Sequence, residues 1–474
     1  MSEILVLGGG LNGLSVALLL ARDGHEVTVL ERDNASPPAA PEAAWEHWER
    51  RGVNQFRMLH VMLPRWRAEM ERELPDVLSE LESWGGLRFN LVARQPVERT
   101  GGWRAGDEQF ETVTGRRPVL EAALAAVANR TPGIQVRRGV AVTGLVTTHD
   151  TGAGAGVPCV GGALVAGGDT VRADLVADTC GRRSPLPAWL DAVGAAAPID
   201  QREDSGFVYY GRHFRSDDGA LPEARTSLLT AHESLSILTL PADNGTWGVG
   251  FITSARDRPL RALRDEQTWD RLLSHYPESA HWRGDAPLAP GVAVMAGIED
   301  RHRSLVVDGR PVVTGIVAVG DSWACTNPSL GRGASIGLLH ACLLRDLLRD
   351  IETADAEKFA CRFHESTCNE IEPLYRMTLD FDRHRLAEIE ADIQGAQYEP
   401  DDPAWAITKA MSSGATADSD VLRAFVSIAA LLATPQEVLS APGLFERVVA
   451  TGAAAPRYPG AGPDRGQILR IIEP

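Results

Sequence analysis

The sequence contains almost no lysine. Lys358 and Lys409 are its only two lysines, so arginine carries nearly all of the positive charge. Acidic residues still outnumber basic residues by 64 to 47, which gives a formal net charge of −17. A protein with this charge is repelled by nucleic acids and by anionic membranes. We therefore expect no nucleic acid partner.

Long apolar runs and closely spaced cysteines are also missing. No stretch of about 18 apolar residues occurs, which predicts that the chain has no membrane span. The six cysteines form no CxxC pair, so we expect no zinc site and no other bound metal. A first strand predicted at 4–7 leaves no room for a signal peptide, and with the scattered cysteines it predicts a cytoplasmic protein.

Strands and helices are predicted to alternate in the first part of the chain. With 474 residues the chain is longer than one core usually holds, so two or three substructures are expected. The opening is a strand, a glycine turn, a helix and a strand, at 4–7, 8–13, 13–23 and 26–31. Hydrophobic periodicity predicts further helices at 61–85 and 117–129, and strands within 133–148 and 163–178.

The middle of the chain changes to an antiparallel pattern. Residues 234–240 and 247–253 alternate around Asn244-Gly245, which predicts a hairpin, and 206–214 is predicted as a third strand. The pattern after Leu338 is mainly helical to about residue 450. There the acidic residues Glu388, Glu390 and Asp392 are predicted to form an exposed helix surface, and 453–463 a loop or tail. The fold class expected is therefore α/β.

A glycine motif lies between the first strand and the first helix. Gly8 permits a tight turn, Gly10 allows the backbone to approach a pyrophosphate, and Gly13 allows the helix to pack closely on the strand. Phosphates are favoured at such a helix N-terminus by free N–H groups and by the helix dipole. Glu31 ends the second strand, where a carboxylate would accept hydrogen bonds from ribose hydroxyls. The motif predicts a dinucleotide site.

Glu31 disfavours a 2′-phosphate, which leaves FAD or NAD as the dinucleotide. The segment 317–341 favours FAD. Asp321 follows a strand and would hydrogen-bond a ribitol hydroxyl. The residues Gly-Arg-Gly-Ala at 331–334 then open a helix predicted at 334–350, whose N–H groups would face the flavin pyrimidine.

Three motifs in this order resemble the FAD-dependent monooxygenase and epoxidase family of the para-hydroxybenzoate hydroxylase fold. They are the glycine motif with Glu31, the segment 173–185, and the segment 319–335. In the third motif, Gly320-Asp321, Pro328 and Gly331-x-Gly333 match the family's Gly-Asp, Pro and Gly-x-Gly. The resemblance covers roughly the first 350 residues.

The resemblance implies further cofactor contacts. Arg50 or Arg51 would reach the FAD phosphates, Arg117 would lie near the cofactor, and the backbone at Val142 would recognise adenine; solvated arginines at helix ends are the alternative. The candidate cofactor-binding residues are Gly8, Gly10, Gly13, Glu31, Arg32, Arg50, Arg117, Val142, Gly320, Asp321, Pro328, Gly331, Gly333 and Ala334.

The middle motif departs from the family's usual form. Many single-component hydroxylases have Asp-Gly in this segment, which handles both FAD and NAD(P)H, whereas this chain has Cys180-Gly181. The segment resembles instead the form found in epoxidase-like and reductase-like branches. We expect FAD as the cofactor, with NAD(P)H acting directly or through a separate flavin reductase, and we favour the reductase as a partner.

The resemblance also implies an organisation into three parts. These are a Rossmann-like FAD-binding domain (1–85, 110–190 and 300–350), an antiparallel β-sheet domain for the substrate (86–109 and 191–299), and a helical C-terminal region (351–474). The pocket would be lined by Tyr209, Tyr210, Trp247, Phe251 and Trp323. About half of them would face the other side of the sheet, because side chains alternate along a strand.

The activity implied is oxygen transfer from a flavin C4a-hydroperoxide to a hydrophobic or aromatic small molecule, with no catalytic side chain that the sequence identifies. A flavin-dependent reductase or halogenase-like enzyme of the same fold is the alternative. The halogenase branch has a catalytic lysine early in the chain, whereas both lysines here follow the third motif. A non-enzymatic scaffold is disfavoured, because it would have no need of a phosphate cradle.

Overall fold

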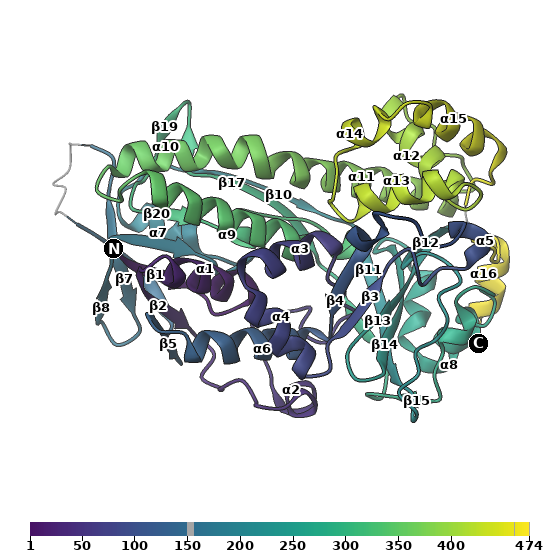
Figure 1. Ribbon diagram of the computed structural model, residues 1–474, viewed down its shortest axis with the longest axis horizontal. Helices are drawn as coiled ribbons and strands as arrows, with labels where there is room; N and C mark the ends of the chain where they lie inside the picture. Colours follow the sequence, from purple (N-terminus) through teal and green to yellow (C-terminus); the bar gives the residue numbers. More distant parts are fainter. Residues whose placement is uncertain (149–155, 459, 474) are drawn as a thin grey trace.

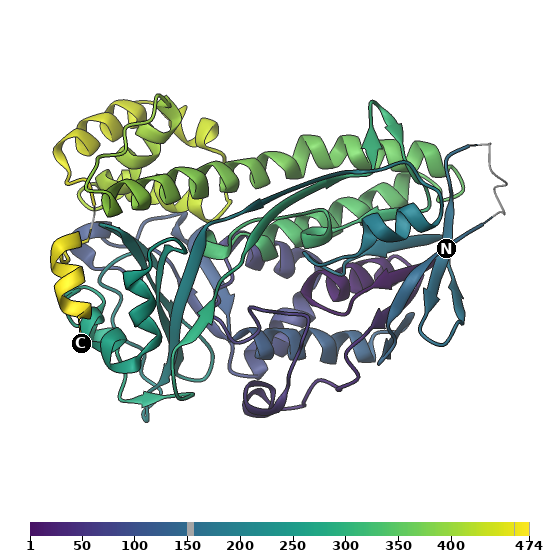
Figure 2. The ribbon, with the colours of Figure 1, turned by 180° about the vertical axis from the view of Figure 1, so that it is seen from behind.

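The computed structural model describes residues 1–148, 156–458 and 460–473. Figure 1 shows a parallel sheet with its helices on one side of the molecule and an antiparallel sheet on the other, with long helices along the top of both. Figure 2 shows the strands β10 (Ile199–Asp204) and β17 (Glu299–Ser304) connecting the two halves from behind. These two strands pair antiparallel over their whole length.

Five parallel strands from distant parts of the chain form the first sheet, in the order β20-β9-β1-β2-β5. They are β1 (Glu3–Leu7), β2 (Glu26–Glu31), β5 (Ile134–Arg138), β9 (Leu175–Asp178) and β20 (Ile316–Ala318). Strands β1, β9 and β20 are almost wholly apolar and buried, as expected of a sheet that is covered on both faces. Because all five strands are parallel, their carboxyl ends share one edge, and the turns that follow them are brought together there.

The helices beside this sheet agree with the sequence pattern except at one position. Helix α1 (Leu11–Arg22) packs against α9 (Gly333–Asp350) and against α6 (Arg117–Arg130). The single helical segment predicted at 61–85 is two helices, α3 (Pro64–Glu73) and α4 (Pro75–Ser83), because Pro75 begins a new helix. Other elements of this half are α2 (Pro41–His47), α7 (Leu186–Ala192), β6 (Val142–Thr147), β7 (Val160–Val165) and β8 (Thr170–Arg172).

The second sheet is antiparallel, and its centre is formed by β13 (Leu235–Pro241), β14 (Thr246–Ser254) and β11 (Phe207–Arg215). The predicted hairpin is confirmed: Asn244 and Gly245 join β13 to β14 with φ angles of 51° and 66°. Its other strands are β12 (Leu229–His232), β15 (Ala286–Pro287) and β16 (Ala293–Met295). One face packs against α8 (Glu266–Leu273) and α16 (Arg465–Ile472).

The C-terminal region is helical, as predicted, and it extends over both sheets (Figure 1). Its helices are α10 (Ala356–Ser366), α11 (Glu372–Ile393), α12 (Pro403–Gly414), α13 (Ser419–Ala429), α14 (Pro435–Leu439) and α15 (Leu444–Ala454). The prediction of an exposed acidic surface is wrong for two of its residues, since Glu388 and Asp392 are only 2% and 4% exposed and form ion pairs. The segment predicted as a loop at 453–463 includes Pro459, which lies outside the described residues.

Shorter elements connect these parts. They are β3 (Leu87–Asn90), β4 (Glu111–Thr114), α5 (Val97–Thr100), β18 (Val306–Val307), β19 (Arg310–Pro311) and β21 (Ala324–Cys325). In the part of the chain that the structure describes, no helix has the length and apolar character needed to cross a bilayer.

A buried ion pair ties the start of α6 to the β13–β14 turn. Arg116 Nη2 and Asp243 Oδ2 are 2.6 Å apart and both side chains are fully buried. We expect Asp243→Ala to lower the free energy of unfolding by about 3–5 kcal/mol, because the buried guanidinium would lose its buried counter-ion and keep only the partly exposed Glu42, 3.0 Å from Nη2. Urea denaturation of the purified variants would measure this. The control is Glu365→Ala, which removes the exposed pair with Arg362 and should cost about 1 kcal/mol or less. Equal urea midpoints for the two variants would contradict the prediction.

Candidate functional site

The glycine turn after β1 leaves open space at the start of α1. Gly8 has a φ angle of +106°, and a Cβ at Gly13 would lie 1.9 Å from the Gly8 carbonyl oxygen, so only glycine fits there. At Gly10 the nearest atom to an added Cβ is Arg50 Nη1 at 3.9 Å. Gly10 is also the N-cap of α1, and no side chain caps this helix. The turn therefore presents uncapped N–H groups to open space, which suits an anion.

Glu31 and Arg50 form a buried pair beside this turn. Glu31 Oε2 accepts a hydrogen bond from the Gly9 N–H at 2.8 Å and is ion-paired with Arg50, while Oε1 accepts from the Asp33 N–H at 2.9 Å. Arg50 Nη1 also donates to the Gly9 carbonyl at 3.0 Å. Of the two arginines considered, Arg50 thus reaches the glycine turn, whereas Arg51 is exposed.

Two further candidates lie at the edges of this region. Arg32 is exposed and directs its guanidinium towards Gly52, away from the pair formed by Glu31. Val142 is the first residue of β6, and the neighbouring Val140 N–H donates to the Glu31 carbonyl at 3.0 Å. The start of β6 therefore lies next to the end of β2, where Glu31 is located.

Asp321 follows β20 and faces a cavity. Its carboxylate makes no hydrogen bond and no ion pair with any residue that the structure describes. Burial raises its pKa, and the nearby arginines Arg182 and Arg117 oppose this rise. Arg117, at the start of α6, lines the same cavity. A partnerless carboxylate in such a position is available for a ligand's hydroxyl group.

The start of α9 lies beside Asp321. Gly331 has a φ angle of +67° and Gly333 is the exposed first residue of the helix, which has no side-chain cap. A Cβ at Gly333 would be 4.0 Å from Asp321 Oδ1. Pro328 and Ala334 line the cavity on either side of these glycines. The N-terminus of α9 and the Asp321 carboxylate therefore face the same part of the cavity.

The two glycine regions meet at Asn12. A Cβ at Gly320 would lie 2.1 Å from Asn12 Nδ2, and one at Gly337 would lie 2.2 Å from Asn12 Oδ1. Asn12 belongs to α1, two residues after Gly10, so the turn after β1 and the turn after β20 are in direct contact. The sequence predicted that these segments converge, and the structure brings them together.

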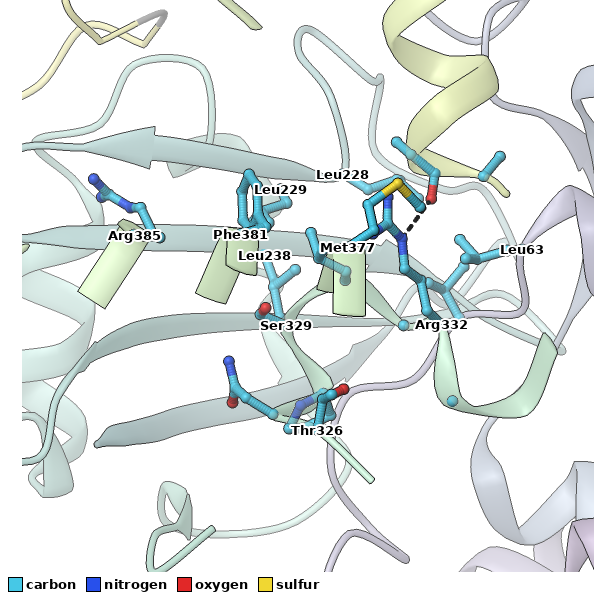
Figure 3. Close-up of a pocket in the computed structure, with 18 of the residues that line it drawn as sticks. Leu63, Leu228, Leu229, Leu238, Thr326, Ser329, Arg332, Met377, Phe381 and Arg385 are labelled. Atoms are coloured by element: carbon cyan, nitrogen blue, oxygen red, sulfur yellow. Dashed lines mark hydrogen bonds between the residues drawn. The ribbon is translucent and has the colours of Figure 1, made fainter. Parts of the chain in front are cut away.

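A cavity of about 860 Å³ extends from this junction between the antiparallel sheet and the C-terminal helices. Figure 3 shows Leu229 and Leu238 on the sheet side and Met377 and Phe381 on α11. Helices α12 and α13 add Trp405 and Phe425, among others, to its wall. The sequence indicated no functional role for these helices, but their side chains form part of the cavity wall.

Only one of the five predicted pocket residues lines this cavity. Tyr209 does, and its hydroxyl donates to Asn327 Oδ1 at 2.6 Å. The prediction is wrong for Tyr210, Trp247, Phe251 and Trp323. The first three lie on the opposite face of the sheet, packed with Trp269, because successive side chains of a strand alternate. Trp323 packs against the rings of His302, His340 and Tyr375.

A buried carboxylate that no sequence pattern indicated lies beside Tyr209. Asp382 Oδ1, on α11, accepts hydrogen bonds from Ser329 Oγ at 2.6 Å and from Asn327 Nδ2 at 3.2 Å. Burial raises the pKa of Asp382 to about 7. Asp300, which accepts from the Asn327 N–H, has its pKa raised to about 6, again by burial. Asp382 and Asp300, two carboxyl groups with raised pKa values, therefore hydrogen-bond to residues of the loop between Asp321 and α9.

The middle motif, at 173–185, contacts both the glycine turn after β1 and the turn after β20. Asp178 ends β9, and its carboxylate accepts from Ser184 Oγ, from Ser322 Oγ and from the Cys180 N–H, at 2.5, 3.2 and 2.9 Å. A Cβ at Gly8 would lie 3.3 Å from the Cys180 Cα. The segment that departs from the family's usual form thus lies against the glycine turn, and Cys180 is a free thiol there.

One group of possible metal ligands occurs among the described residues, away from the cavity. Donor atoms of Glu69, Glu73 and Cys342 lie within 4.8 Å of one another. Both carboxylates are already ion-paired, with Arg65, Arg72 and Arg345. We therefore interpret the group as an ion-pair cluster.

The raised pKa of Asp382 makes stability depend on pH. Its pKa rises from 3.8 to about 7 on folding, so the folded state binds the proton more tightly and the free energy of unfolding falls as pH rises through this range. Asp382→Asn removes this titration. The urea midpoint of the variant, relative to wild type, should therefore be higher at pH 8 than at pH 5. Asp380→Asn, on the exposed face of the same helix, is the control and should show no such change. A difference that is the same at both pH values would contradict the assignment.

Comparisons with known proteins agree with this geometry. Residues 3–78 match the family model for FAD dependent oxidoreductases. The Mycobacterium tuberculosis protein named Protein Rv3254 is 28% identical over 78% of this chain and 78% of its own length. The FAD-dependent monooxygenase atnJ of Arthrinium sp is 24% identical over 78% of this chain and 81% of its own length.

Solved structures show the same fold. The structure of pqsL, a probable FAD-dependent monooxygenase from Pseudomonas aeruginosa, superposes with a TM-score of 0.57 at 16% identity, over 82% of this chain and 99% of that one. The predicted fold class, a Rossmann-like unit with an antiparallel sheet and a helical C-terminal region, is confirmed. The family match over residues 3–78, the named relative and the shared fold make the chain similar to FAD-dependent oxidoreductases, with the architecture of the para-hydroxybenzoate hydroxylase-type monooxygenases.

Proposed function

We propose that this chain is a monooxygenase that uses FAD to transfer one oxygen atom from dioxygen to an apolar or aromatic small molecule. The observation that carries the proposal is one continuous cavity. At one end lie Asp321 and the uncapped starts of α1 and α9, and at the other an apolar chamber lies between the sheet and α11. Such a cavity has room for a cofactor's reactive end and a substrate together.

The residues present fit FAD. The open space at Gly10 would take the pyrophosphate at the start of α1, and the partnerless Asp321 carboxylate would accept a ribitol hydroxyl. Glu31 already accepts three hydrogen bonds, but a carboxylate has about four acceptor positions, so Oε1 can still take a ribose hydroxyl. The start of α9 would place N–H groups at the flavin pyrimidine.

When bound, FAD supplies the redox chemistry and the activation of dioxygen. The chain's own residues orient the substrate and exclude water. The leucines of the sheet and the apolar side chains of α11 provide a dry wall. Tyr209 donates a hydrogen bond to Asn327, and a phenol oxygen can also accept one from a substrate hydroxyl.

We further propose that reducing equivalents come from NAD(P)H through a separate flavin reductase, in the cytoplasm. Cys180 in place of the acid of the middle motif, next to the glycine turn, supports this proposal. The six free cysteines are consistent with a reducing compartment. A flavin-dependent reductase of the same fold is the second candidate. A halogenase is disfavoured because neither Lys358 nor Lys409 lines the cavity, and Lys409 is paired with Glu388 at 2.9 Å.

Gly10→Val tests the proposed cofactor site. A valine side chain would fill the space intended for the pyrophosphate, yet it meets no protein atom within about 3.9 Å of its Cβ. The variant should therefore keep the urea midpoint of the wild-type apoprotein but bind no FAD, measured by flavin absorbance after gel filtration. Gly13→Val is the contrast, because its Cβ would collide with the Gly8 carbonyl and destabilise the fold itself. Stoichiometric FAD in Gly10→Val would place the cofactor elsewhere.

Reduction and labelling separate the candidate activities. NADPH alone should bleach the flavin slowly, because the chain lacks the middle-motif acid. With a flavin reductase and ¹⁸O₂, mass spectrometry of a panel of aromatic compounds should find one labelled oxygen in the product. Rapid bleaching by NADPH alone would overturn the need for a reductase. Hydrogenation of a substrate double bond without label would favour the second candidate.

A further inference from the structure

Arg332 occupies the variable position of the Gly331-x-Gly333 motif and lines the cavity (Figure 3). Its side chain is 5% exposed and extends away from α9 towards α11 and α13. Nη1 donates to Thr378 Oγ1 at 3.2 Å, Nη2 to the Ile428 carbonyl at 3.0 Å, and Nε to the Ala429 carbonyl at 3.3 Å. The C-terminal helices thus fix this guanidinium at the wall of the chamber.

All three partners of Arg332 are neutral. Five other arginines line the cavity. Arg117, Arg376 and Arg385 form ion pairs with Glu121, Glu372 and Glu388, whereas Arg94 and Arg182 form none with the described residues. Arg332 forms no ion pair with any described residue. Burial lowers its pKa to about 10, so the side chain still carries its charge at neutral pH. A buried charge without a counter-charge is costly, and an anion in the cavity would remove that cost.

The nearest acid is a poor counter-ion. Asp382 acts on Arg332 through space but forms no ion pair with it: its Oδ1 accepts from Ser329 and Asn327, and its buried Oδ2 has no hydrogen-bond partner. Because the pKa of Asp382 is about 7, the group is close to half protonated at neutral pH. The carbonyls of Ile428 and Ala429 end α13, so the negative end of this helix dipole meets part of the positive charge, but no carboxylate forms an ion pair with it.

The donors left on Arg332 match a planar anion. A guanidinium has five N–H groups, and three are engaged, which leaves one on each terminal nitrogen. Two donors on neighbouring nitrogens suit the two oxygens of a carboxylate. The surrounding wall is apolar, with Leu63, Met377 and Phe381 among its residues.

We propose that the substrate is an apolar or aromatic carboxylic acid, and that Arg332 binds its carboxylate. The inference rests on the proposed function, since it names the class of molecule that occupies the same chamber. The bound carboxylate would give the buried guanidinium of Arg332 the counter-charge that the protein does not supply. It also gives the chamber a fixed point from which the apolar body of the substrate extends.

Calorimetric titration of the FAD-loaded protein with 2-naphthoate and with its neutral amide, 2-naphthamide, tests this proposal. Wild type should bind the acid roughly ten- to hundredfold more tightly than the amide, as expected for charge-assisted hydrogen bonds. Arg332→Met should weaken binding of the acid to the level of the amide and leave the amide unchanged. Arg376→Met is the matched control, because it removes a cavity-lining arginine that is exposed and already paired, and it should keep the wild-type preference.

The titration needs no turnover, so it is independent of oxygen transfer. If the acid is preferred but no ¹⁸O enters any product, the proposed function fails and the anion site stands. If wild type binds acid and amide equally, or Arg332→Met keeps the preference, the inference is overturned. Competition by chloride or bromide without any preference for the acid would identify a halide site and would also overturn it. Should Arg332→Met fail to fold, the wild-type comparison of acid and amide decides alone.

Discussion

The contact between α1 and α9 at Asn12 is the constraint on which the rest of the site depends. Gly320 and Gly337 both lie so close to the Asn12 amide that neither position has room for a side chain. Because of this close approach, the turn after β1 and the turn after β20 share one surface. Asp178, at the end of the strand between them, holds the second turn through Ser322 and its own segment through Ser184. Three motifs from distant parts of the sequence are thereby locked into one edge of the sheet.

The chamber beyond this edge depends on a second close contact. Gly211, Gly248 and Gly250 form a bare patch on the face of the antiparallel sheet that also carries Tyr209, and Leu59 lies directly over it. A Cβ at Gly211 would be 2.2 Å from Leu59 Cδ1. The patch therefore lets the segment before α3 cross the sheet and form part of the chamber wall. The other wall is α11, whose Asp382 supports the loop that leads into α9.

The sequence predicted the parts of this structure that depend on local pattern. The glycine turn, the strand-end acids, the hairpin at Asn244-Gly245 and the helix after Gly333 all follow from neighbouring residues. The faces of β11 could not be predicted, because every residue from Phe207 to Phe214 is buried and alternation alone does not say which side meets a cavity. The role of Asp382 could not be predicted either, because its partner Asn327 lies 55 residues earlier and a helical pattern does not indicate such a contact.

The cavity wall is formed by two kinds of structural element, tight turns at one end and helix surfaces at the other. The end proposed to hold FAD is made of turns with little room for change: an added carbon would collide with backbone at Gly8 and Gly13, and with the Asn12 side chain at Gly320 and Gly337. The far end is made of ordinary helix surfaces, α11 to α13, whose apolar side chains can be exchanged for others of different size. Selectivity can therefore diversify in the C-terminal helices while the end proposed to hold FAD stays constant, provided that Thr378 still binds Arg332 and Asp382 still binds Ser329.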